Sequence, residues 1–201
     1  MASDGRRWWA LVGAVAAGVG AGVVIGGGLA PRVYDWETEW NIDAPLADVY
    51  VALSGAENTF WPSMQVARIV HDSKAVDGRA VHYRVKQAAS VARFAPPFHI
   101  VSRMTVIEEQ RRWRQAVTGD LVGALETHFF ARPDGGTRIV YNWYVRVSNP
   151  LFNLAGFVVE PVFRASHDHV MREGEAGLQA SCAARLGQSG ATRLETQEPN
   201  S

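Results

Sequence analysis

The chain has 201 residues, of which 47% are hydrophobic and 20% are charged, and its basic and acidic residues are equal in number, so the formal net charge is zero. This size and composition fit one globular domain with appendages. Because only Lys74 and Lys86 are lysines, no dense cationic patch points to nucleic-acid binding, and we expect no nucleic-acid partner.

The N-terminal region contains a long uncharged run. Residues 8–30 read WWALVGAVAAGVGAGVVIGGGLA and lie between Arg6-Arg7 and Pro31-Arg32. A helix of this length can cross about 30 Å of hydrocarbon, so we predict one transmembrane helix over residues 8–30. A cleavable signal peptide is the alternative, because small residues precede Pro31 where a peptidase would cut. Proline directly after the cut disfavours that alternative, and we expect an uncleaved anchor.

The charges beside this run predict its orientation. Two arginines precede it and only Arg32 follows closely, so the positive-inside rule places residues 1–7 in the cytoplasm and the main domain outside. The protein would then be a single-pass protein of the cell membrane. Gly18, Gly22 and Gly26 recur at four-residue spacing and offer a groove for homo-oligomer formation between two spans. A glycine-rich span without a partner is the alternative.

Between residues 33 and 147 the chain is a succession of strand-like runs. The first run places Tyr34, Trp36, Thr38, Trp40 and Ile42 on one face. Helical spacing of apolar residues after Pro45 then predicts a short helix. Further strands are predicted at Val66–Asp72, Ala80–Gln87, Phe98–Glu108, Trp113–Thr118, Gly123–Ala131 and Thr137–Val147. Because no crossover helix separates these runs, and RPDGGT is a strong hairpin signal, we expect an antiparallel sheet.

The last part of the domain is helical in pattern. Leu151 to Leu186 reads as one long helix, in which Pro161 causes either a kink or a restart. Residues 187–201 are rich in Gly, Ser, Thr, Gln and Glu, and we predict a disordered tail. Residues 33–186 therefore form an α+β domain in which a curved antiparallel sheet is closed by a long C-terminal helix. Such an arrangement leaves a cavity between helix and sheet.

Four segments resemble a known superfamily. NIDAPLADVYVAL is similar to the opening strand and helix of the START-like or Bet v 1-like helix-grip superfamily, also called SRPBCC. GDLVG, PDGGTRIVYNWYVRV and PVFRASHDHVMREGEAGL resemble its polyketide cyclase/dehydrase and lipid-transport branch, whose last helix carries a His, a Met and two glycines, here His167, Met171, Gly174 and Gly177. No motif in the resemblance is a catalytic signature. The chain departs from the branch at Ala165-Ser166, where an aromatic residue and Asn often stand.

The resemblance implies a helix-grip fold over residues 33–186 with a cavity for a hydrophobic ligand. Lipid carriers, hormone-binding proteins and aromatase/cyclases share this fold, so the fold alone does not choose a function. The predicted transmembrane helix is an addition to the soluble core of the superfamily. We expect a hydrophobic small molecule or lipid as partner and no cofactor.

The segment HDHVMREGEAGL, residues 167–178, is the strongest candidate for chemistry. His167 and His169 could share a metal on a strand, but on a helix they point about 200° apart. Apolar residues and glycines recur here at three and four residues, which indicates a helix, so we expect no metal site. His167 then either faces a ligand, as a hydrogen-bonding or acid–base group, or packs the helix on the sheet. Gly174 and Gly177 are predicted to permit close packing of the helix.

Inward aromatic residues are the other candidates for binding. We predict that the ligand contacts Trp61, Tyr83, Trp113, Tyr141, Trp143, Phe163, His167 and Met171. The alternative for each is an ordinary core position.

Three functions remain open from the sequence. The first is a membrane-anchored module that binds a hydrophobic molecule or lipid without covalent chemistry. The second is an aromatase or cyclase for a polyketide-like substrate, with His167 as acid or base. The third is a structural or interaction protein whose cavity is filled by its own side chains.

Overall fold

The computed structural model describes residues 32–54, 60–86, 97–148 and 156–195. The predicted membrane span over residues 8–30, its glycines and residues 1–7 lie outside these ranges. Among the described residues, no helix combines the length and the apolar composition that a membrane crossing needs.

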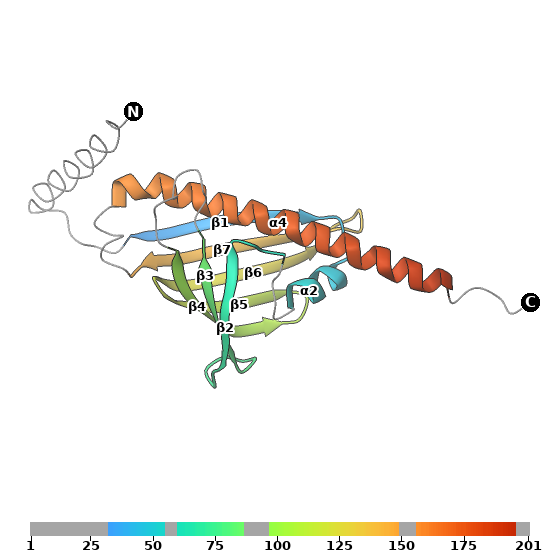
Figure 1. Ribbon diagram of the computed structural model, residues 1–201, viewed down its shortest axis with the longest axis horizontal. Coiled ribbons are helices and arrows are strands. Elements are labelled where there is room, and N and C mark those ends of the chain that lie inside the picture. Colours follow the sequence, from blue (N-terminus) through green and yellow to red (C-terminus); the bar gives the residue numbers. More distant parts are fainter. Residues whose placement is uncertain (1–31, 55–59, 87–96, 149–155, 196–201) are drawn as a thin grey trace, which may run out of the picture.

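Seven antiparallel strands form one sheet, as the sequence predicts (Figure 1). They are β1 (Val33–Ile42), β2 (Met64–His71), β3 (Arg79–Val85), β4 (Phe98–Glu108), β5 (Arg112–Gly119), β6 (Leu121–Ala131) and β7 (Thr137–Val147), in the spatial order β1-β7-β6-β5-β4-β3-β2. Strands that follow one another from β2 to β7 are paired with each other. The last strand, β7, also pairs with the first strand, β1. The chain therefore builds most of its sheet from local hairpins.

Two helices lie on one face of this sheet (Figure 1). The short helix α2 (Leu46–Ser54) follows β1, and the long helix α4 (Gly156–Glu195) crosses the sheet and contacts both α2 and β1. Pro161 lies within α4, so the helix does not restart there. The α+β class and the closing C-terminal helix are thus confirmed.

The prediction for the C-terminal tail is wrong in its first part. We expected disorder from Gly187, but α4 continues to Glu195. Ala183, Ala184, Arg185 and Leu186 have high helix propensity, and a helix that is already formed propagates at little cost. Glycine in a helix costs about 1 kcal/mol, which weakens α4 at Gly187 without ending it.

The inward face of the sheet carries the alternation that the sequence shows. In β7, Ile139, Tyr141, Val145 and Val147 are all buried. In β1 the buried residues are Tyr34, Trp40 and Ile42. Trp40 is 1% exposed and packs against the rings of Trp61 and Tyr141. These aromatic side chains form the centre of the core beneath α4.

Gly174 and Gly177 of α4 allow neighbouring groups to approach the helix closely. A Cβ on Gly174 would lie 2.6 Å from the Trp40 ring and 2.6 Å from the Trp61 ring. A Cβ on Gly177 would lie 1.9 Å from the carbonyl oxygen of Phe60. All three distances are far below van der Waals contact, so the predicted packing role is confirmed. At Gly177 the approaching group is the backbone beside Trp61, whereas we had expected the sheet.

Polar side chains of α4 bind backbone N–H groups at the strand ends. The Ser63 amide donates to Glu173 Oε2 at 2.8 Å, and the Asn41 amide donates to Glu175 Oε1 at 2.9 Å. The Asp43 amide donates to Gln179 Oε1, also at 2.9 Å. These bonds satisfy amides at the end of β1 and at the start of β2, and they set the position of α4 along the sheet.

Candidate ligand-binding site

The strand register aligns the cavity side chains in rows across the sheet. One row runs from Trp143 through Leu125 to Gln115, because these residues pair across β7, β6 and β5. The next row runs from Tyr141 through Thr127 to Trp113 in the same strands. Adjacent rows are about 7 Å apart, since a strand rises about 3.3 Å per residue. Both rows face the helices and form the floor of a cavity.

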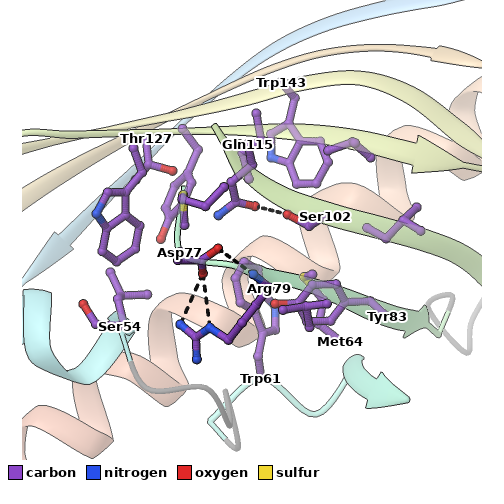
Figure 2. A pocket seen from close by; sticks show the side chains of 18 residues that line it. Ser54, Trp61, Met64, Asp77, Arg79, Tyr83, Ser102, Gln115, Thr127 and Trp143 are labelled. Atoms are coloured by element: carbon purple, nitrogen blue, oxygen red, sulfur yellow. Dashed lines mark hydrogen bonds and ion pairs between the residues drawn. The ribbon is translucent and has the colours of Figure 1, made fainter. Parts of the chain in front are cut away.

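This main cavity has a volume of about 160 Å³. Its lining residues are Leu53, Ser54, Trp61, Met64, Asp77, Arg79, Val81, Tyr83, Ile100, Ser102, Met104, Trp113, Gln115, Val117, Leu125, Thr127, Tyr141 and Trp143 (Figure 2). Side chains of α2, of the Trp61–Met64 segment and of the inward strand faces enclose it. A water molecule occupies about 30 Å³ of liquid, so the described side chains do not fill this space. The hypothesis of a filled cavity loses its support here.

The mouth of the main cavity is polar. Ser54 and Arg79 are the exposed residues of the lining, at the end of α2 and the start of β3. Arg79 donates to Asp77 through Nε at 3.3 Å and through its Nη2 at 3.2 Å (Figure 2). These two charges satisfy each other at the surface. Deeper in the cavity, the described lining carries no charged side chain.

Two aromatic residues of the lining have hydrogen-bond partners in the fold. Trp61 Nε1 donates to the carbonyl oxygen of Val170 at 2.7 Å, which ties the segment before β2 to α4. Trp113 Nε1 donates to the Tyr50 hydroxyl at 3.2 Å, which ties β5 to α2. Structural roles account for both indole N–H groups.

Two other aromatic residues of the lining have no such partner. Tyr141 is 4% exposed, and its hydroxyl is buried without a hydrogen bond among the described residues. The Trp143 Nε1 is buried and likewise without a partner in this part of the chain. Burial raises the pKa of Tyr141 far above its usual value, so the hydroxyl keeps its proton and stays a donor.

Ser102 and Gln115 form a polar pair on the cavity floor. Ser102 Oγ donates to Gln115 Oε1 at 2.7 Å (Figure 2). The amide nitrogen of Gln115 is not used in this contact. We did not predict this pair, because single polar residues in β4 and β5 show no signal until the register brings them together.

A smaller, apolar cavity of about 70 Å³ lies beside the main one. Its lining residues are Trp36, Met64, Val85, Lys86, Phe98, Ile100, Leu121, Trp143, Val145, Phe163, Ser166, His167, Val170 and Met171. Met64, Ile100 and Trp143 line both cavities and therefore form the boundary between them.

His167 lies in this smaller cavity and is held by aromatic rings. Its side chain is 13% exposed, its ring centroid lies 4.6 Å from that of Trp36, and it meets the Trp143 ring edge-on at 6.1 Å. Nδ1 lies 3.4 Å from the Asp168 carboxylate, and Nε2 is buried with no partner among the described residues. Burial is the main cause that lowers the pKa of His167, so the imidazole is neutral at neutral pH. His169 is exposed, so the two histidines face different sides of α4, as the helical spacing predicts.

All eight predicted ligand-binding residues line one of the two cavities, but not the same one. Trp61, Tyr83, Trp113, Tyr141 and Trp143 line the main cavity. Phe163, His167 and Met171 line the smaller cavity together with Trp143. The sequence shows which residues face inward, whereas the division depends on where α4 lies over the strands. Groups of three or more metal-ligating side chains do not occur within the described ranges, and Cys182 is buried as a free thiol.

Solved structures share this architecture. No protein-family model matches the chain, and none of the curated proteins matches it. The Zhui aromatase/cyclase from Streptomyces sp. R1128 aligns with a TM-score of 0.58 and 16% identity over 77% of this chain and 96% of its own. Ara h 8.0201 aligns with a TM-score of 0.53 and 14% identity over 76% of this chain and 99% of its own.

The chain has a helix-grip fold. A conserved protein from Geobacillus kaustophilus also aligns, with a TM-score of 0.59 and 9% identity over 75% of this chain and 96% of its own. At such low sequence identities the likeness establishes the helix-grip fold alone. The kind of ligand has to be inferred from the residues that line the cavity.

Proposed function

We propose that this helix-grip domain binds a small, mainly apolar molecule in the main cavity, without covalent chemistry. The observation that carries the proposal is the space of about 160 Å³ between the sheet, the end of α2 and the Trp61–Met64 segment, lined largely by aromatic and aliphatic side chains. A dry cavity of about 150 Å³ in another protein accommodates benzene. A molecule built around one ring therefore matches the space available here.

The chemistry of the lining favours binding over catalysis. The charged residues of the described lining, Asp77 and Arg79, pair with each other at the mouth. A nucleophile beside a general base, which covalent catalysis needs, is not found in the described lining of the main cavity. The aromatase/cyclase neighbour shares the fold, but a shared fold carries no reaction to this chain.

Uptake of ring-sized molecules by the full-length, delipidated protein tests the proposal. We expect a panel of fatty acid, sterol, isoprenoid and single-ring aromatic molecules to give binding by the ring-sized members, with a Kd on the order of 0.1 mM or tighter. The change in tryptophan fluorescence reports occupancy, because Trp61, Trp113 and Trp143 line the cavity. A panel in which no member binds would contradict the proposal.

A pair of valine substitutions supplies the control. Val117 is 2% exposed and lines the main cavity, so Val117→Phe places a ring in the space that the ligand needs. Val51 is 55% exposed on α2, so Val51→Phe adds the same ring outside the cavity. Uptake should be lost in the first variant and kept in the second, with circular dichroism showing that both are folded.

We further propose that residues 8–30 anchor the domain in a membrane. The support is the uncharged run itself, which is long enough to cross the hydrocarbon as a helix. An anchored cavity could exchange an apolar ligand with the nearby bilayer, so the ligand would not travel far through water.

Membrane fractionation of the full chain tests the anchor. The protein should stay in the membrane pellet after an alkaline wash, whereas the double substitution Val19→Arg and Val23→Arg should release it. Each arginine at the centre of a span costs about 2.5–3.5 kcal/mol. Recovery of the unchanged protein in the alkaline supernatant would contradict the anchor without affecting the cavity.

A further inference from the structure

We propose that the ligand of the main cavity carries an uncharged hydrogen-bond acceptor, such as a ketone or ester carbonyl, which receives bonds from Tyr141 and Trp143. This inference rests on the proposed binding function and specifies the chemical class of the ligand.

The first step concerns the two buried donors. Trp143 Nε1 can only donate a hydrogen bond, and the Tyr141 hydroxyl stays protonated. Both atoms are buried without a partner among the described residues. Buried polar groups in folded proteins almost always have partners, because an unmet donor costs more free energy than a formed bond gains. An acceptor that enters from the cavity would satisfy them.

The second step is their position on the sheet. Tyr141 and Trp143 lie two residues apart on the inward face of β7, and both line the main cavity. In contrast, the indole N–H groups of Trp61 and Trp113 already have hydrogen-bond partners within the fold. Trp40 Nε1 is also unpaired, but Trp40 is packed between other rings and lines neither cavity. Tyr141 and Trp143 are therefore the residues with an unpaired buried donor that line the main cavity.

The third step excludes a charged ligand group at this depth. The one cationic side chain of the described main-cavity lining is Arg79, which pairs with Asp77 at the mouth. Burial of a carboxylate or phosphate without a cation is costly. Nearby neutral groups, the Ser102–Gln115 pair in particular, suit a neutral oxygen instead. The geometry points to a ring-sized carbonyl compound with its oxygen turned toward β7.

Two probes of the same shape isolate the acceptor. Acetophenone carries a carbonyl oxygen where α-methylstyrene carries a CH₂ group, and both have one ring. Tyr141→Phe removes only a hydroxyl, and Trp143→Phe removes the indole N–H while it keeps an aromatic ring. We expect each substitution to weaken acetophenone binding by about fivefold to tenfold and to change the Kd of α-methylstyrene by less than about twofold.

Tyr50→Phe is the matched control, because it removes a hydroxyl that has a partner and lies outside both lining sets. This control should lower Tm by about 2–4 °C. Because it also leaves Trp113 Nε1, a donor of the cavity lining, without its partner, it is a control for stability and not for affinity. Tyr141→Phe should leave the Tm of the ligand-free protein unchanged or raise it, because the lost hydroxyl had no partner there. A purely structural hydroxyl at Tyr141 would instead lower Tm, as in the control.

The outcomes separate this inference from the proposed function. If both probes bind the full chain and neither substitution changes their affinity ratio, the acceptor is not received at Tyr141 and Trp143, while cavity binding stands. If neither probe binds, the proposed function itself is overturned together with the inference. The Tm of each variant is measured first, and affinities are compared only where the Tm lies above the assay temperature, so that every protein compared is folded.

Discussion

Gly177→Ala is expected to lower the free energy of unfolding by about 2–3 kcal/mol. Helix propensity alone would favour alanine by about 1 kcal/mol, because glycine loses more backbone entropy on folding. The added Cβ, however, would lie 1.9 Å from the carbonyl oxygen of Phe60, which is a backbone atom. A backbone carbonyl cannot rotate away as the end of a flexible side chain can, so α4 or the Phe60 segment must move.

Gly187→Ala supplies the matched control on the same helix. Nothing lies within 4 Å of a Cβ at Gly187, so only the propensity gain remains. We expect this variant to be more stable by up to about 1 kcal/mol. Urea unfolding of the full chain measures both changes, and an equal gain in the two variants would show that α4 does not contact Phe60 as described.

Trp40→Ala is expected to have the largest effect, a loss of about 3–5 kcal/mol in the free energy of unfolding. Trp40 is 1% exposed and lies between Trp61 and Tyr141, directly beneath Gly174. Truncation opens a cavity that the surrounding strands cannot close, because the backbone of Trp40 is held by its pairing with Ile139 within the ladder of β1 and β7.

Two further substitutions test the cause of that loss. Trp40→Phe should cost clearly less than Trp40→Ala, since it keeps a ring and removes an Nε1 that is buried without a partner. Tyr144→Ala removes an aromatic side chain that is 60% exposed and should change the stability by less than about 1 kcal/mol. Similar losses for Trp40→Ala and Tyr144→Ala would contradict the placement of Trp40 at the core.

The fold was predictable where local patterns dominate. Strand β4 and strand β7 have the bounds that alternation predicts, Phe98–Glu108 and Thr137–Val147. Strand β6 begins at Leu121, two residues before its predicted start, because Gly119 takes a positive φ of 110° and Asp120 alone separates β5 from β6. The end of α4 was misjudged, because the composition of a tail does not show how far a preceding helix propagates.

The candidate site was predictable only in part. Inward aromatic residues follow from alternation and helical spacing, and all of the predicted ones line a cavity. The same patterns cannot show that Trp61 and Trp113 have partners on other elements, at Val170 and Tyr50, whereas Trp143 has none among the described residues.

The sequence by itself determined the antiparallel sheet, the inward faces of its strands and the glycine positions of the closing helix, because each depends on the spacing of neighbouring residues. Only the tertiary structure decided where the space lies, how Met64, Ile100 and Trp143 divide it, and which polar atoms face it unpaired. Those properties depend on how α4 is positioned over the sheet by bonds such as that from the Asn41 amide to Glu175, which join residues far apart in the chain. For His167, helical spacing predicted the inward face, and the fold then placed it in the smaller cavity between Trp36 and Trp143.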